Sequence, residues 1–363
     1  MGKRYMAAFL GVLMMVLSVL TPITVNAAGR NADHTFQLDG IKTGDAVADP
    51  SQQEAENAAK TDREVSENEL SGNEISAVTE SVYSYSGALS MGKASKSLIS
   101  DRIIQIYSAD YPLFDVRPNT SAPYSLGQVS AEHIQKALES VNLMRMIAGL
   151  PDVYLYNGYS QMAQHGAVVL AANDTLTHTP SQPAGMDGDF YQNGYTAASR
   201  SNIAYGWMSS GSYDMPMFTL GYMEDSGTGN VSTVGHRRWI LNPNMKYTGF
   251  GFAINERNAA YSAMYAFDKS TAAPDYDFIS WPSSGNFPTE LASTQMPWHV
   301  TLNPSKFDVS KMNTDSVKIT ITAPDGTSQT ITGADVTGSI ELKYQPYYTI
   351  NKVGYGVNNA IIF

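Results

Sequence analysis

The stretch that decides the fold is GHRRWILNP, residues 235–243, together with FGFAI, residues 250–254, a few positions later. The second run is short and apolar, which is typical of a strand. In the first run, Trp239 and Ile240 are expected to enter the core. One of the two arginines, Arg237 or Arg238, is expected to reach solvent or to pair with an acid.

Two helices are predicted upstream of this stretch. Ser130 can cap the first, in which apolar residues recur at helical spacing until Gly149. The second is expected over residues 159–172. Its small residues on the buried side, such as Ala163 and Gly166, would allow close backbone packing.

The remaining pattern mixes helix and strand. A third helical stretch is expected around residues 207–222, although Gly211 and Pro216 interrupt it. After Asp277 the pattern is that of strands, with a hairpin turn at Asp325-Gly326. Because helices and strands alternate without a regular βαβ repeat, the fold class is predicted to be α+β. The expected C-terminal strands cover residues 298–302, 317–322, 327–331, 340–344 and 357–363.

Composition and charge limit the functions open to the chain. It has 363 residues, no cysteine and a net charge of −11, and this acidity disfavours a nucleic-acid partner. Twelve acidic residues against four basic ones, and a single aromatic residue, lie between residues 29 and 80. Such a segment buries too little apolar surface to offset the entropy of ordering it. Residues 28–97 are therefore expected to be an acidic, disordered linker.

The first residues have the pattern of a secretory signal peptide. Lys3 and Arg4 precede an apolar run at residues 7–20, and cleavage is expected after Ala27. No later run reaches the length of a transmembrane helix. We therefore expect a secreted protein that is released, or held non-covalently at the cell surface. Without cysteine, core burial must stabilise it.

Four motifs follow one another along the middle of the chain. They are VNLMR at residues 141–145, Thr177-His178, SNIA at residues 201–204, and residues 235–251, which begin with Gly-His and end with Gly-Phe-Gly. In order and spacing they resemble the CAP superfamily of cysteine-rich secretory proteins, antigen 5 and pathogenesis-related 1 proteins, whose domain is also called SCP. The run GHRRWILNP and the lack of cysteine are similar to the cysteine-free bacterial members.

This resemblance implies a CAP-type α-β-α sandwich with an open cleft lined by two histidines and two acids. His178 and His236 match the two histidines. The first acid is missing, because Ser201 stands where the family has glutamate. The candidates for cleft or ligand-binding residues are therefore His178, His236, Ser201, Asn202, Glu224 and Asp225.

Three further residues of these motifs are expected to support the fold. Asn142 and Arg145 match the family's Asn-x-x-Arg helix, and Arg145 is expected to tie that helix to loops. Trp239 is expected in the core.

The resemblance and the composition together divide the chain into four parts. Residues 1–27 are the expected signal peptide and residues 28–97 the linker. Residues 98–275 are the expected CAP domain with an N-terminal extension. Residues 276–363 have strands at the spacing of a small all-β immunoglobulin-like sandwich.

Two chemistries are open to the histidine pair. Two imidazoles in one cleft can hold a divalent metal such as zinc or magnesium, with a nearby carboxylate as a third ligand. Alternatively the rings hydrogen-bond to backbone and organise loops. We favour the second, because His178 and His236 lie 58 residues apart without the local spacing of a zinc motif.

Three functions are consistent with these residues. The favoured one is a secreted, non-enzymatic CAP module that needs no cofactor and binds an extracellular lipid, peptide, glycan or cell-surface partner. One alternative is a metal-assisted hydrolase that uses His178 and His236. The other is an adhesin that acts through the β domain. Ser201 in place of the family glutamate favours the binding module.

Overall fold

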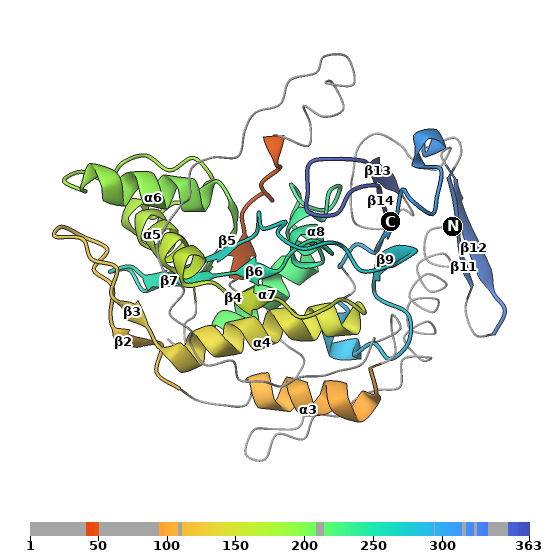
Figure 1. The fold of residues 1–363 in the computed structure, drawn as a ribbon, viewed down its shortest axis with the longest axis horizontal. Coiled ribbons are helices and arrows are strands. Elements are labelled where there is room, and N and C mark those ends of the chain that lie inside the picture. Colours follow the sequence, from red (N-terminus) through yellow and green to blue (C-terminus); the bar gives the residue numbers. More distant parts are fainter. Residues whose placement is uncertain are drawn as a thin grey trace, which may run out of the picture.

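The computed structural model describes residues 41–50, 94–107, 111–207, 214–293, 295–313, 317–322, 325–332 and 348–363 (Figure 1). Among these residues, no helix is long and apolar enough to cross a membrane. The expected signal peptide and the expected strand at residues 340–344 lie outside the described residues.

A four-stranded antiparallel sheet forms the centre of the molecule. Its two inner strands, β5 and β8, pair along seven residues each. The strand order is β1 (Ile41–Thr43), β5 (Ser201–Trp207), β8 (Ala259–Tyr265) and β7 (Phe250–Ile254).

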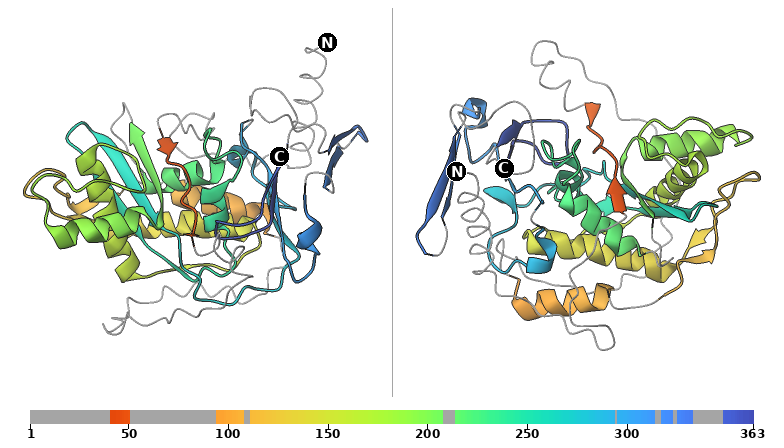
Figure 2. Two further views of the ribbon diagram at one scale, coloured as in Figure 1. Left: turned by 90° about the horizontal axis from the view of Figure 1, so that it is seen from above. Right: turned by 180° about the vertical axis from the view of Figure 1, so that it is seen from behind.

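Helices cover both faces of this sheet (Figures 1 and 2). Because side chains alternate along a strand, Phe252 packs into the core on one face and Ala253 into the core on the other. α5 (Asn157–Asn173) and α6 (Gly188–Ala198) lie on the Ala253 side. The Phe252 side holds α4 (Ala131–Ile147), α7 (Met215–Glu224) and α8 (Gly235–Ile240), and α3 (Lys96–Tyr107) packs against α4. The predicted α+β class is confirmed.

The C-terminal part forms a second antiparallel sheet. Its order is β13 (Thr349–Asn351), β14 (Ala360–Ile362), β10 (His299–Leu302) and β9 (Phe278–Trp281). A separate hairpin joins β11 (Lys318–Thr322) to β12 (Ser328–Thr332). The described strands do not establish two packed sheets, so the immunoglobulin-like sandwich stays a prediction. The short elements are β2 (Phe114–Val116), β3 (Gln128–Val129), β4 (Tyr154–Leu155), β6 (Tyr247–Thr248), η1 (Thr289–Leu291) and η2 (Val309–Lys311).

One hydrophobic core runs across the expected domain boundary at residue 276. Ile279, Trp281 and Val357 belong to the same buried cluster as residues of α4 and α7. Arg237 and Arg238 add polar contacts across this boundary, and both are fully buried. The expectation that one of them reaches solvent or pairs with an acid is not met: neither reaches solvent, and carbonyl oxygens from the C-terminal part accept from both guanidinium groups.

Two elements differ from the sequence-based expectation. Residues 201–207 form β5, and the helix that was expected around residues 207–222 begins only at Met215. Pro216 explains this start, because proline is favoured in the first turn of a helix, where its missing N–H costs nothing.

Part of the expected linker is ordered. Residues 41–43 are β1 (red in Figure 1), paired with β5, and residues 44–50 continue from it. Asp49 is buried, with 7% of its surface exposed. The expectation of disorder rested on composition averaged over the whole segment, which hides the β-branched residues Ile41 and Thr43 in this short piece.

At Gly251 the backbone of β7 lies close against the backbone of α5. A Cβ atom at this position would lie 2.2 Å from the backbone oxygen of Ala163. Backbone cannot yield as a flexible side chain can. The small residues of α5 thus allow the helix to rest directly on β7, as the sequence predicts.

We expect Gly251→Ala to lower the free energy of unfolding by about 3 kcal/mol, because the added methyl group forces α5 away from β7. Urea denaturation measures the change. Gly188→Ala is the matched control, since a Cβ there meets nothing within 4 Å. Equal midpoints for both variants would contradict the proposed contact.

Candidate functional site

His236 and Asp225 form a buried pair where α7 ends and α8 begins. His236 Nδ1 lies 2.8 Å from Asp225 Oδ1, and both side chains are completely buried. An ionised carboxylate only accepts hydrogen bonds, so Nδ1 carries the proton. The other oxygen, Oδ2, accepts from the backbone N–H of Arg237 at 3.0 Å. One carboxylate therefore fixes both the ring and the first turn of α8.

Asn202 lies on the same side of the sheet and holds the backbone of His236. Its Nδ2 donates to His236 O at 3.0 Å. The Tyr222 hydroxyl donates to Asn202 O at 3.1 Å, and its ring stacks on that of His236 with centroids 5.5 Å apart. Within the described residues, His236 Nε2 is buried and has no hydrogen-bond partner.

His178 lies in the loop after α5, and both of its ring nitrogens face carbonyl oxygens. Nδ1 is 2.5 Å from Ala198 O, and Nε2 is 2.5 Å from Asp45 O. Burial lowers the pKa of His178; both carbonyl contacts oppose this shift, while the charge of His236 adds to it. A neutral imidazole has one N–H, so it donates to one of these carbonyls at a time.

Two of the predicted site residues do not join the histidines. Ser201 precedes Asn202 on β5, so its side chain faces the side of the sheet opposite to Asn202 and His236. Its hydroxyl is buried without a partner among the described residues. The carboxylate of Glu224 accepts from the hydroxyl of Ser293 instead. Asp225 is thus the acid that contacts a histidine.

The three predicted structural residues connect distant backbone. Asn142 makes a reciprocal pair of hydrogen bonds with the backbone of Val153, at 2.8 and 3.0 Å. Arg145 is fully buried and donates to the carbonyl oxygens of Ile240 and Asn242 at 2.8 and 2.9 Å. Trp239 is also buried, and its indole reaches the backbone of a segment near the N-terminus.

Residues 41–50 cover the site, and we call them the N-terminal segment. Besides the contact of Asp45 O with His178, the indole Nε1 of Trp239 donates to Val47 O at 2.8 Å. Gly44 N donates to Ile203 O at 3.1 Å, which extends the pairing of β1 with β5. The resemblance implies an open cleft. In this structure the chain's own backbone lies there instead.

Asn230 is a site residue that no sequence motif indicated. Its Oδ1 accepts from Ala46 N at 2.8 Å, and its Nδ2 donates to Gly44 O at 2.9 Å. Lys269 is another, with Nζ 2.5 Å from Asp49 Oδ2. Each contacts a segment more than 180 residues away, so no local pattern could have marked them.

These contacts do not fit a metal site. A catalytic zinc ion takes three protein ligands and an open position. Among the described residues there is no group of three or more histidine, cysteine, aspartate or glutamate side chains that could hold an ion. Both nitrogens of His178 already face backbone oxygens.

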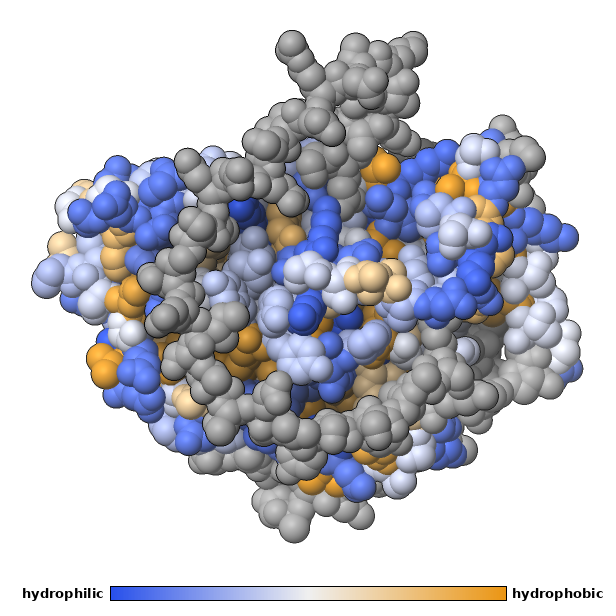
Figure 3. Space-filling view, in the orientation of Figure 1, coloured by the Kyte–Doolittle hydropathy of each residue, from blue (hydrophilic) through white to orange (hydrophobic). Residues whose placement is uncertain are grey.

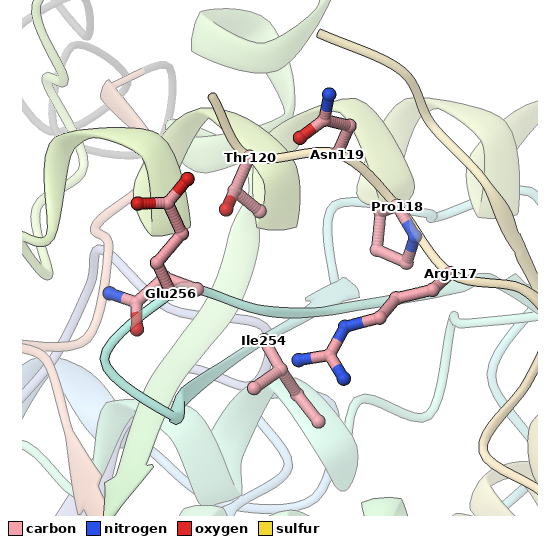
Figure 4. Close-up of a pocket in the computed structure, with 7 residues that line it drawn as sticks. Arg117, Pro118, Asn119, Thr120, Ile254 and Glu256 are labelled. Atoms are coloured by element: carbon pink, nitrogen blue, oxygen red, sulfur yellow. The ribbon is translucent and has the colours of Figure 1, made fainter. Parts of the chain in front are cut away.

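A surface pocket of about 420 Å³ lies elsewhere (Figure 4). None of the predicted site residues lines it. In Figure 4, Arg117 and Glu256 approach it from different segments. Its lining residues are Arg117, Pro118, Asn119, Thr120, Ile254, Asn255 and Glu256.

We expect Asp225→Ala to lower the free energy of unfolding by about 3 kcal/mol, because it leaves His236 Nδ1 and Arg237 N buried without an acceptor. Chemical denaturation measures this. Glu224→Ala is the matched control and should change stability by about 0.5 kcal/mol or less, since its carboxylate bonds to an exposed hydroxyl. If the Asp225→Ala and Glu224→Ala variants lose equal stability, the hydrogen bonds of Asp225 to His236 and Arg237 do not contribute the stability expected of them.

Comparison with known proteins agrees with this geometry. Residues 138–266 match the family model described as CAP, the cysteine-rich secretory protein family. The match begins in α4 and ends just after β8, so it includes the strands β5, β7 and β8 of the central sheet and both histidines, but not β1. No curated protein matches the chain. The chain therefore contains a CAP domain, without cysteine, at residues 138–266.

Proposed function

We propose that the chain is an exported, non-enzymatic binding protein whose CAP domain holds an extended peptide beside His178 and Trp239. The observation that carries this proposal is that residues of the site form hydrogen bonds with the main chain of the N-terminal segment. Export is part of the proposal and depends on the signal peptide expected at residues 1–27.

The contacts with the N-terminal segment favour a peptide as the ligand class. His178, Asn230 and Trp239 all bind backbone atoms of the segment, and Asn230 adds one longer contact, of 3.4 Å, to the hydroxyl of Thr43. Strand pairing with β5 adds further backbone hydrogen bonds. Binding of this kind, in which a peptide adds a strand to a sheet edge, depends on extended conformation more than on sequence.

The roles of the two histidines favour binding over catalysis. A general base needs a nitrogen that can reach the proton of a substrate or water. Both ring nitrogens of His178 face backbone oxygens, and His236 is completely buried. Among the described residues the Ser201 hydroxyl has no hydrogen-bond partner, so neither histidine is in place to activate it. The metal-assisted hydrolase therefore has no support from these contacts.

The distribution of apolar side chains favours peptide over lipid. Lipid binding calls for a contiguous apolar surface. On the face drawn in Figure 3, apolar side chains lie in small groups among hydrophilic ones. Among the described residues, the exposed large apolar side chains are scattered along the sequence apart from the neighbours Tyr154 and Tyr156; the others are Val116, Trp207, Phe278 and Phe307.

The proposal is tested with a labelled peptide of residues 40–50 and the full chain carrying Ala46→Trp. This substitution dislodges the N-terminal segment, because Ala46 packs against Gly235, where a Cβ would lie 2.4 Å from that of Ala46. We expect fluorescence anisotropy to detect peptide binding to this variant at concentrations below about 1 mM, which is an upper value for the effective concentration of a segment on a flexible linker. A scrambled peptide should bind at least about tenfold more weakly, because strand register would be lost.

His178→Ala, added to Ala46→Trp, should weaken binding of the peptide about fivefold, since one hydrogen bond to a carbonyl contributes about 1 kcal/mol. Lys42→Trp is the matched control for the bulky substitution, because residue 42 is exposed, and it should behave as the wild type. Mass spectrometry should find the peptide intact after incubation. A folded Ala46→Trp variant that binds no peptide would overturn the proposal, and cleavage of the peptide would support the hydrolase instead.

A further inference from the structure

We propose that the N-terminal segment is a built-in competitor for the peptide site, and that a partner displaces it with an extended segment of the same small-x-small-x-x-acid pattern, as in Gly44-x-Ala46-x-x-Asp49. This inference rests on the proposed function and adds to it the selection of the partner and the regulation of the site.

Two positions of the segment demand small residues. A Cβ at Gly44 would lie 3.3 Å from the side chain of Ile203 and 3.4 Å from that of Leu176. Ala46 lies so close to Gly235 that a Cβ there would be 2.4 Å from its own. A longer side chain at residue 44 would press on the side chains of Ile203 and Leu176, and one at residue 46 would press on the start of α8 at Gly235. The site therefore selects glycine or alanine at these two positions.

A third position demands an acid. Asp49 is buried, and its Oδ2 lies 2.5 Å from Lys269 Nζ. Its backbone N–H also donates to Gly354 O at 2.7 Å. A carboxylate at this place meets a cation, whereas an amide or an apolar side chain would leave Lys269 without this charged partner. The distance between Ala46 and Asp49 is fixed because the backbone of the segment is held at residues 46, 47 and 49. There it bonds to Asn230, Trp239 and Gly354.

The segment can leave without unfolding the domain. β1 is a three-residue edge strand, and its removal uncovers the edge of β5 but breaks no bond between β5 and β8. The entropy cost of ordering ten residues offsets much of what their hydrogen bonds and burial contribute. The uncovered edge of β5 is then available to another strand.

We call the state in which the N-terminal segment occupies the site the closed form. It dominates because the competing segment belongs to the same chain. A covalently linked segment competes at an effective concentration that reaches about 1 mM. A peptide in solution must displace the segment that is already bound. We therefore expect wild-type protein to bind the peptide of residues 40–50 at least about tenfold more weakly than the Ala46→Trp variant does.

A disulfide can hold the closed form reversibly. The hydrogen bond from Gly44 N to Ile203 O makes the neighbouring pair, Thr43 and Ala204, one without backbone hydrogen bonds. Such pairs have Cα atoms about 4.5 Å apart, which a disulfide can span. Because the chain has no cysteine, the double variant Thr43→Cys/Ala204→Cys contains a single thiol pair.

We expect the oxidised double variant to bind no labelled peptide up to about 1 mM, because the disulfide keeps the segment in the site. After reduction, its affinity should return to that of the wild type. The single variants Thr43→Cys and Ala204→Cys should bind alike with and without reductant. Circular dichroism of the reduced forms checks that they are folded.

Peptide variants test the selection, with the Ala46→Trp chain as receptor. Peptides that carry Ala46→Trp or Asp49→Lys should bind at least about tenfold more weakly than the parent, since the first clashes with Gly235 and the second meets Lys269. A peptide with Lys42→Ala is the control, because Lys42 is exposed.

The outcomes separate the two proposals. If the Ala46→Trp chain binds no peptide, the proposed function fails. If it binds, but the oxidised double variant or the wild type binds equally well, then the function stands and the competitor is overturned. Cysteines that stay reduced and react with maleimide under oxidising conditions would also contradict the closed form. If the peptides carrying Ala46→Trp and Asp49→Lys bind as tightly as the parent, the selection is overturned.

Discussion

Three fully buried arginines, Arg145, Arg237 and Arg238, hold the described parts of the chain together. Burial lowers their pKa values to about 10, about 10 and about 9, so each remains a cation at neutral pH. Burying a cation is costly unless acceptors surround it. Here the acceptors are mostly backbone carbonyl oxygens that come from remote segments, such as Pro297 for Arg237 and Val357 for Arg238. Each guanidinium therefore makes the position of one segment depend on another.

This arrangement explains why a short helix can carry the site. α8 has six residues, too few to be stable by itself. Arg237 ties it to the end of α7 through the carbonyl oxygens of Met223 and Glu224, and Arg238 ties it to the C-terminal strands. The remaining residues of the helix are then fixed, and His236 and Trp239 face Asp225 and the N-terminal segment. The C-terminal part thus helps to hold α8, and with it His236 and Trp239, in position.

Local patterns predicted local structure well. α4 and α5 follow from Ser130 as a cap and from apolar periodicity, because these signals lie within the helices themselves. The same sequence did not reveal that Arg237 and Arg238 are both buried, because their acceptors are supplied by segments 60 and 119 residues away. The histidines were found through motifs. The N-terminal segment was missed because its composition is that of a linker, and its order comes from contacts with residues such as Trp239 and Asn230.

The identity of the groups at the site explains why its ligand should be a peptide. When the N-terminal segment leaves, His178 Nε2 loses the carbonyl oxygen of Asp45, and Trp239 Nε1 loses that of Val47. Asn230 loses both an N–H and a carbonyl partner. Buried or half-buried donors left without acceptors are costly, so a replacement must supply carbonyl oxygens two residues apart, with an N–H between them. An extended polypeptide does this by its covalent structure. A lipid chain supplies no such groups, and a sugar ring does not repeat them at the spacing of a strand.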